Sequence, residues 1–383
     1  MDKIRYNPLV IGLGANGLGV LRSLAVKNIR AKALVSARES REVYFHTRHG
    51  DKQVLPNLDG ARVLEFLRQQ HDPLLLMPVR EKVVLYLSRH RNEIPAHHYL
   101  PLPDHEVLET LLNKEKFSCF ARQHNLALPR SLTIHTIEQL DGFRDDVRFP
   151  MIVKPVNKQA IAGLPKAVIV DNERELRRSS EKFLAVLPEI FIQEFIPGGD
   201  GNIYFCLQHI NRDGTLTASF VGRKIRQWPP LAGGTASCEP ARIPELHQMT
   251  VDIFARAGFW GTGSIEYKLD PRTRQFMIIE PTAGRTDFQE YVATANGVNI
   301  PWMAWCEANG QPVKPCIKTG GKRGWMHFIN DRLARERARP KLTIPAWLWS
   351  LRRVRAFDFF SLSDPGPALQ YVRTVLAGRF GGN

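Results

Sequence analysis

The chain has 383 residues, more than one hydrophobic core accommodates, so two or three domains are expected. A hydrophobic content of 43% and a charged content of 24% are ordinary for a soluble globular protein. No apolar run reaches the ~18 residues that cross a bilayer, so we do not expect an integral membrane protein. Five scattered cysteines without CxxC spacing argue against a disulfide framework or a zinc site and favour the cytoplasm.

The formal net charge of +15 is unevenly distributed along the chain. The last 66 residues hold 13 Lys and Arg against 4 Asp and Glu, a surplus of nine positive charges. Within them, residues 344–355 mix tryptophan and arginine, which suits a membrane interface but also a helix docked on the body with solvated arginines. Such a segment favours anionic partners, among which nucleic acid is the least expected because no RNA-binding signature is present.

The N-terminal residues predict a strand, a glycine turn and a helix. The apolar residues 9–11 precede residues 12–19, whose glycines follow the GxGxxG spacing of dinucleotide-binding folds, and a second strand is expected at 31–35. Lys3 and Arg5 precede the apolar stretch as in a signal peptide. The glycines within it and the lack of a cleavage site favour a buried strand and turn instead.

An NADP-dependent oxidoreductase is one alternative that this glycine turn leaves open. Ser36 stands where an acid would hold the ribose of NAD, and Arg38 and Arg41 suit a 2′-phosphate. A buried strand at residues 73–78 continues the alternating α/β pattern to about residue 105.

The middle of the chain alternates further strands and helices. A single helix is predicted over residues 104–124, a polar helix from residue 173 and a further helix near 247–257. The expected strands span residues 151–155, 167–170, 190–196, 202–209 and 216–223.

Two carboxylates, Glu266 and Glu280, lie in neighbouring strand-like runs. Residues 263–268 and 276–280 are separated by a turn signal at 270–274, which predicts an antiparallel hairpin with both acids on one face. Like charges held together need a cation, and oxygen ligands on rigid strands suit Mg²⁺ or Mn²⁺. An ordinary hairpin whose acids face solvent is the alternative.

Other charged residues precede this hairpin in a characteristic order. They are Lys114, Lys154 at the end of an apolar strand, the stretch 193–196 and Asp200. No GxxxxGK[ST] loop is present to hold phosphates. Over roughly residues 8–310 this ordered set resembles the ATP-grasp superfamily, and it is most similar to a branch of carboxylate–amine ligases related to D-aspartate ligase.

The resemblance implies an α/β fold in four parts. A Rossmann-like domain that precedes the ATP-grasp domain would span residues 1–105, and the small ATP-grasp subdomain would span 106–190. A C-terminal subdomain carrying the metal site would span 191–315, and a basic extension would occupy 316–383. Both ATP-grasp subdomains would have an α+β arrangement.

It also implies roles for individual residues. Lys114 and Lys154 would contact phosphates, and Asp200 would bind the ribose. The adenine would be held by Gln193, Glu194, Phe195 and Ile196, and the metal ion by Glu266, Glu280 and Thr282.

Three residues or stretches depart from the family pattern. Thr282 replaces the usual Asn of the metal motif, although its hydroxyl can still coordinate. Gln193 replaces an acid that is common at the adenine-facing position. The loop over the phosphates, residues 157–163, has one glycine where the family is often glycine-rich.

Lys224 and Arg285 are the predicted catalytic residues. Lys224 lies in the basic stretch 223–230, before the small residues 233–237, and this segment suits close approach to a phosphate or carboxylate. Arg285 follows the metal acids, where it would grip a substrate carboxylate or stabilise an oxyanion. The expected chemistry is ATP-driven amide formation through an acyl phosphate, with ATP and Mg²⁺ or Mn²⁺ required and small carboxylates and amines as substrates. A non-enzymatic protein that binds membrane surfaces through its basic tail is the remaining alternative.

Overall fold

The computed structural model describes residues 5–146, 148–156, 164–165, 167–230, 233–338 and 340–378. The chain divides into two compact units. The first comprises residues 1–120, 203–266 and 280–383, and the second comprises residues 121–202 and 267–279. No helix among the described residues combines the length and the hydropathy that a membrane span requires.

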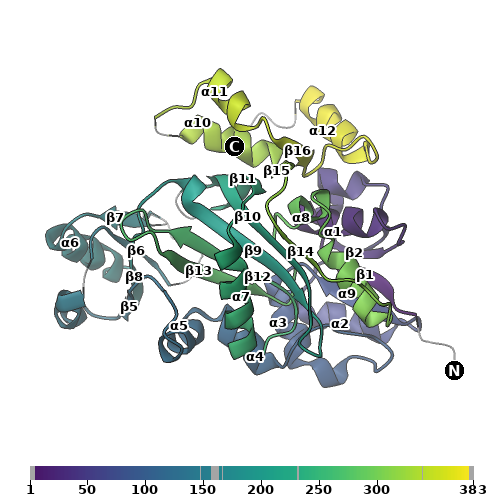
Figure 1. Ribbon diagram of the computed structural model, residues 1–383, viewed down its shortest axis with the longest axis horizontal. Coiled ribbons are helices and arrows are strands. Elements are labelled where there is room, and N and C mark those ends of the chain that lie inside the picture. The colour runs from purple at the N-terminus through teal and green to yellow at the C-terminus, as the bar shows by residue number, and fades with distance from the viewer. Residues whose placement is uncertain are drawn as a thin grey trace. The chain divides into compact units, whose positions relative to one another are not determined.

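The first unit begins with a four-stranded sheet in the order β3-β2-β1-β4, with every strand parallel to its neighbours (Figure 1). Strands β1, β2 and β4 are mostly apolar and buried, as parallel strands covered on both faces require, whereas the edge strand β3 is largely polar and exposed. The strands are β1 (Asn7–Ile11), β2 (Lys32–Ser36), β3 (Asp51–Leu55) and β4 (Leu74–Pro78). The helices that follow three of them are α1 (Gly14–Ala25), α2 (Gly60–Arg68) and α3 (Glu81–Arg89).

A larger sheet of eight strands has the order β13-β12-β9-β10-β11-β15-β16, and β14 also pairs with β10. Strands β12 and β13 are the predicted acidic hairpin, and they are adjacent in this sheet as expected. The strands are β9 (Ile203–Ile210), β10 (Leu216–Trp228), β11 (Gly234–Pro240), β12 (Gly261–Leu269), β13 (Phe276–Ala283), β14 (Cys316–Thr319), β15 (Gly324–Met326) and β16 (Val354–Phe357).

Helices cover this sheet because its strands carry apolar side chains on both faces. Phe205 and Phe220 pack with residues of α8 (Tyr291–Ala295) and α9 (Ile300–Ala308) in one core cluster. Helix α7 (Pro244–Arg256) also packs on β9 and β10, where Gln208 donates a hydrogen bond to the carbonyl of His247. Helix α1 contacts both α8 and α9, and this contact connects the two sheets of the first unit.

Residues 316–378 are folded onto the first unit, with β15 and β16 extending the large sheet (Figure 1). Asp331 anchors this segment because its carboxylate accepts hydrogen bonds from Arg226 of β10 at 2.8 and 3.0 Å, from Trp347 at 2.6 Å, and from Ser237 of β11. Its helices are α10 (Phe328–Arg337), α11 (Ile344–Ser350) and α12 (Gly366–Leu376).

The second unit contains a four-stranded antiparallel sheet in the order β5-β8-β6-β7. Its core includes Phe183 of α6 (Glu173–Leu184) and Ile192 of the central strand β8. The strands are β5 (Ser131–Ile134), β6 (Met151–Pro155), β7 (Val168–Val170) and β8 (Ile190–Glu194). Short 3₁₀ segments in the chain are Glu39–Arg41, Val43–His46, Arg91–Glu93, Ile137–Asp146 and Asp200–Asn202.

The prediction of one helix over residues 104–124 is wrong, because two helices occupy this stretch. They are α4 (His105–Leu112) and α5 (Lys114–Gln123). Asn113 separates them in an extended conformation, and its side chain accepts hydrogen bonds from the amides of Glu115 and Lys116. Asparagine caps a helix start in this way, so the local side-chain bond prevails over the helical pattern.

Candidate active site

Glu266 of β12 forms a buried ion pair with Lys224 of β10. The Lys224 Nζ donates to Glu266 Oε2 at 2.9 Å, and the two side chains are 2% and 14% exposed. Because β9 lies between these strands, the long lysine side chain must reach across it to the carboxylate. The basic strand and the acidic hairpin, predicted separately, therefore meet on one face of the large sheet.

Glu280 and Asp287 add two more negative groups close to this pair. Burial raises the pKa of Glu266 to about 7; Lys224 opposes this shift, while the charges of Asp287 and Glu280 add to it. Burial would lower the pKa of Lys224, but attraction by Glu266, Asp287 and Glu280 raises it above its ordinary value. We call these four residues the acid cluster; it holds three carboxyl groups and one ammonium.

Asp287 was not predicted as a site residue. Its carboxylate accepts a hydrogen bond from the Ser264 hydroxyl at 2.8 Å and another from the Gln289 amide at 3.1 Å. These bonds fix Asp287 beside the hairpin although it lies beyond the end of β13. The segment that returns Asp287 to the hairpin has no regular periodicity. No sequence pattern other than the acidic residue itself indicated its position.

The donor chemistry of the acid cluster fits a hard cation. Glu280 and Thr282 are two residues apart on β13, so they lie on the same side of the strand. Within the described part of the chain, no three acidic, histidine or cysteine side chains converge as a complete metal site. Two carboxylates that need further oxygen ligands are typical of Mg²⁺, which is commonly completed by water and substrate phosphates. The residues therefore fit the predicted ion, and its ligand set stays a prediction.

Arg285 lies on the segment that follows β13. Its guanidinium pairs with Glu81 of α3 at 3.5 Å and donates to the carbonyl of Thr286 at 3.2 Å. The buried Nε has no hydrogen-bond partner among the described residues. The turn before it requires Gly284, because φ is +74° there and an added Cβ would lie 2.6 Å from Leu102. A guanidinium with remaining donor capacity suits the predicted role in binding an anion.

The glycine turn of the first sheet holds the segment that carries Arg285 in place. The Asn16 side chain donates to the Thr286 carbonyl at 2.9 Å and accepts from the Thr286 hydroxyl at 2.7 Å. Both groups are buried. Asn16 therefore holds the backbone next to Arg285 and Asp287 across 270 residues of sequence.

A buried carboxylate accepts a hydrogen bond from the same turn. Glu39 accepts hydrogen bonds from the amides of Leu13 and Ser36, each at 2.8 Å, and from Arg80. Burial alone would raise the pKa of Glu39, but these bonds and the guanidinium lower it, so the group stays charged. A pyrophosphate would meet this negative charge, which argues against the NADP alternative.

In the second unit, Lys154 and Gln193 lie on the neighbouring strands β6 and β8. The Lys154 Nζ is 3.4 Å from the Gln193 Oε1 and 5.0 Å from the centre of the Phe191 ring. The ammonium therefore lies at the end of an apolar strand beside a neutral amide and an aromatic face. The loop at residues 157–163, predicted to cover phosphates, lies outside the described residues.

The predicted adenine-binding stretch begins at the end of β8. Its backbone is partly used by the sheet, since the amides of Glu194 and Phe195 donate to the carbonyls of Arg130 and Pro150. Among the described residues the Ile196 amide donates no hydrogen bond, so it is the NH of this stretch best placed to bind a base.

Two basic residues that were not predicted lie beside this stretch. Arg272 pairs with the buried Glu194 at 2.7 Å, and Lys268 lies 4.6 Å from the centre of the Phe195 ring. Burial lowers the pKa of Lys268, while Asp200 and Asp270 raise it. Both come from the hairpin tip, which belongs to the second unit, so only the fold reveals them. We call residues 193–196 with Lys154, Lys268 and Arg272 the hinge region.

Lys114 is the first residue of α5, in the first unit, and its side chain is exposed. It follows the capping residue Asn113, so the polar pair that suggested a phosphate motif also defines a helix start.

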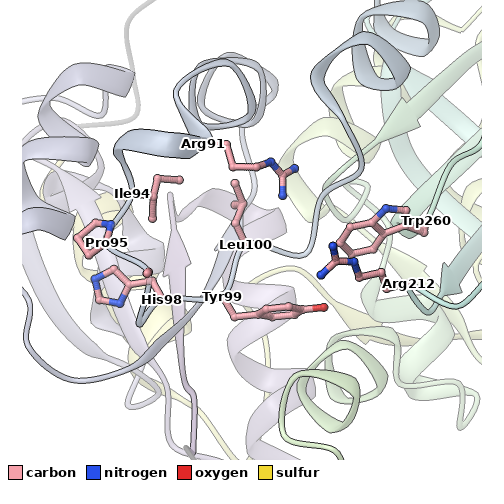
Figure 2. Close-up of a pocket in the computed structure, with 9 residues that line it drawn as sticks. Arg91, Ile94, Pro95, His98, Tyr99, Leu100, Arg212 and Trp260 are labelled. Carbon is pink, nitrogen blue, oxygen red and sulfur yellow. The ribbon is translucent and has the colours of Figure 1, made fainter.

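A separate pocket of about 190 Å³ in the first unit contains no predicted site residue. Figure 2 shows Arg91 and the ring of Tyr99 on one side of it, with Arg212 lying against Trp260 on the other. The Arg91 guanidinium donates to the carbonyls of Leu102 and Pro103. These contacts fix the segment that precedes α4.

Comparison with known proteins gives relatives at low identity. No family model matches the chain. It is 24% identical to a D-aspartate ligase from Enterococcus faecium, over 78% of this chain and 76% of that protein. It is also 24% identical to the C-terminal section of the carbamoyl phosphate synthase large chain from Methanopyrus kandleri, over 76% of this chain but only 56% of that protein.

Solved structures show the same fold. Biotin carboxylase from Campylobacter jejuni superposes with a TM-score of 0.63 at 14% identity, over 82% of this chain and 73% of that one. N5-carboxyaminoimidazole synthetase from Staphylococcus aureus also gives 0.63 at 14% identity, over 83% and 82% of the two chains. These comparisons confirm the resemblance inferred from the order of the charged motifs.

Proposed function

We propose that this protein, an enzyme with the ATP-grasp fold, is an ATP-dependent carboxylate–amine ligase that acts through an acyl phosphate. The observation that supports this most directly is the acid cluster, in which the buried pair of Lys224 and Glu266 lies near enough to Glu280 and Asp287 to feel their charges. Three acids around one ammonium are unstable as a purely structural feature unless a further cation balances them. The comparisons give no support to an oxidoreductase or to a non-enzymatic binding protein.

ATP would be recognised by residues that each unit supplies separately. In the second unit, the Ile196 amide and the backbone of the hinge region would bind adenine, Asp200 would bind the ribose, and Lys154 would contact phosphate. In the first unit, Lys114 would contact phosphate, and Glu266, Glu280 and Thr282 would hold Mg²⁺ or Mn²⁺. The bound ion would neutralise negative charge on the phosphates.

Arg285 and Lys224 would act on the substrate. Arg285 would bind its carboxylate, whose oxygen attacks the γ-phosphorus while ADP leaves. An amine then attacks the carbonyl carbon of the acyl phosphate, phosphate departs and the nitrogen loses a proton. Lys224 would offset the charge that develops on the oxygens in both steps, because it is fixed by Glu266 and excluded from water. No nucleophilic side chain is required.

The place of this reaction would be the cytoplasm. All five cysteines are free thiols, and Cys119 is exposed. Reduced, accessible thiols are typical of proteins in reducing compartments.

An ATP-hydrolysis screen against pooled amino acids, dipeptides and amino sugars tests the proposal. We expect phosphate release that requires a divalent cation and both substrates, with a product whose mass equals their sum less one water. Thermal-shift assays would compare ATP with Mg²⁺ against NADPH. Stabilisation by NADPH but not by ATP with Mg²⁺ would overturn the ligase proposal.

A further inference from the structure

The exposed apolar side chains of this protein are concentrated at its C-terminal end. Of the 13 large hydrophobic side chains that are exposed in the described residues, eight lie within residues 344–376. They are Ile344, Leu348, Trp349, Leu362, Leu369, Val372, Val375 and Leu376. This concentration is unlike the scattered exposed apolar residues that any soluble protein carries.

Helix α11 presents its apolar residues outward because its other face is anchored. Trp347 donates to Asp331 at 2.6 Å, and Ser350 accepts from Arg226 at 2.8 Å, so these two side chains point to the body. Ile344, Leu348 and Trp349 then face away, with Trp349 69% exposed. Tryptophan and leucine on an outward face are the residues that insert at a lipid interface.

Helix α12 carries a second apolar stripe. Leu369, Val372 and Leu376 follow the spacing i, i+3, i+7, so they share one side of the helix. Tyr371 packs against Phe359 on the inner side, which fixes the stripe outward. In Figure 1, α11 and α12 both lie along the upper edge of the view.

The charges around these helices are almost all positive at the surface. Between residues 318 and 378 three of the four acids, Asp331, Asp358 and Asp364, are buried, and only Glu336 is exposed. Asp331 and Asp364 are neutralised by Arg226 and Arg22 in buried ion pairs. Among the described residues from 332 to 378, the exposed cations are Arg332, Arg337, Lys341, Arg352, Arg353, Arg355 and Arg373.

We propose that α11, α12 and these cations form a docking surface for an anionic membrane. Arginines would contact lipid phosphates while the apolar side chains enter the boundary between headgroups and acyl chains. The Arg352 guanidinium lies 4.9 Å from the centre of the Trp349 ring, so the cation and the membrane-seeking ring belong to one surface. Nucleic acid would match the charge but leave eight apolar side chains in water, and a second copy of this chain would place like charges together. This surface is independent of the proposed ligase site.

Cosedimentation of the full chain with vesicles tests this proposal. We expect binding to phosphatidylcholine vesicles that contain about 30% phosphatidylglycerol, little binding to pure phosphatidylcholine, and weaker binding as salt rises from about 0.1 to 0.5 M. The double variant Leu348→Ser/Trp349→Ser should weaken partitioning by at least about tenfold. The matched control Val26→Ser/Val54→Ser changes two exposed apolar residues elsewhere and should bind like the parent.

Charge reversal provides a second test. Arg352→Glu/Arg373→Glu should weaken binding to anionic vesicles by about tenfold or more, whereas the control Arg30→Glu/Lys82→Glu, which reverses two exposed cations elsewhere, should not. Equal binding to neutral and anionic vesicles, or no binding, would overturn the proposal. So would duplex DNA binding or self-association in sedimentation velocity that the Leu348/Trp349 variant abolishes without an effect on vesicles.

Discussion

The acid cluster of the first unit is mainly negative, whereas the hinge region of the second unit carries positive charges next to aromatic rings. In the first, three carboxyl groups share the single ammonium of Lys224. In the second, Lys154 and Lys268 lie against the rings of Phe191 and Phe195. One region is short of positive charge and the other presents it on apolar surfaces, so the first suits a metal ion and the second suits a nucleotide.

The largest expected effect comes from removing a charge of the acid cluster. Glu280→Gln should reduce ligase turnover by about 10³-fold, because the metal ion loses a carboxylate ligand while the side-chain volume is kept. Activity is measured as phosphate release, and folding by circular dichroism. Glu65→Gln, an exposed acid on α2, is the control and should have full activity. Turnover within about twofold of the parent for Glu280→Gln would remove Glu280 from the site.

Removing the cation should instead destabilise the same region. Lys224→Met leaves Glu266 buried without its partner, so we expect a loss of about 3 kcal/mol in the free energy of unfolding. Mg²⁺ should restore more stability in this variant than in the parent, since the ion replaces part of the missing charge. Urea unfolding with and without Mg²⁺ measures both effects. If Mg²⁺ stabilises the two proteins equally, the cluster does not hold the ion.

The hinge region should respond in nucleotide affinity. Lys154→Met should weaken ATP binding by about tenfold, because the variant lacks the ammonium that would contact a phosphate. Calorimetry measures the dissociation constant. Lys182→Met, an exposed lysine on α6, should bind ATP like the parent. Weakening in both variants would point to net charge rather than to this site.

The last effect depends on pH and concerns Glu290, a buried acid without a cation beside it among the described residues. Burial raises its pKa to about 8, while the hydroxyls of Ser23 and Thr294 lower it in part. The folded protein therefore keeps a proton that the unfolded chain has lost above pH 4.5. This stability is present below that pH and is lost as the pH rises through 8, with a slope of at most about 1.4 kcal/mol per pH unit.

Glu290→Gln should flatten this dependence, because glutamine is neutral at every pH. Urea midpoints between pH 5 and 8.5 measure it, with Glu65→Gln as the control. If the parent and the Glu290→Gln variant lose stability in parallel, Glu290 is not the responsible group.

The sequence predicted those parts of the site that depend on neighbouring residues. The hairpin of Glu266 and Glu280 has a turn signal and apolar strands, so its pairing could be predicted from about 20 residues. The ion pair of Glu266 with Lys224 could not, because it depends on the order of strands in the sheet and spans 42 residues. The contact of Asn16 with Thr286 depends on how two sheets pack, and glycine spacing gave no signal for it.

Sequence patterns also failed at positions where hydrogen bonds of a polar side chain set the local structure. Asn113 ends one helix and begins another through two side-chain bonds, in a stretch whose apolar periodicity is continuous. Asp287 reaches the acid cluster from an irregular segment, and its position follows from bonds to Ser264 and Gln289. Such placements follow from single hydrogen bonds formed only in the folded chain.

Asp331 anchors the C-terminal segment to β10, the strand that also carries Lys224. Proteolytic clipping before α10 would leave the Arg226 guanidinium without its counter-ion, only two positions along β10 from Lys224. A protein shortened before α10 would also lack β16 of the large sheet, so the C-terminal segment completes both the sheet and the charge balance of β10.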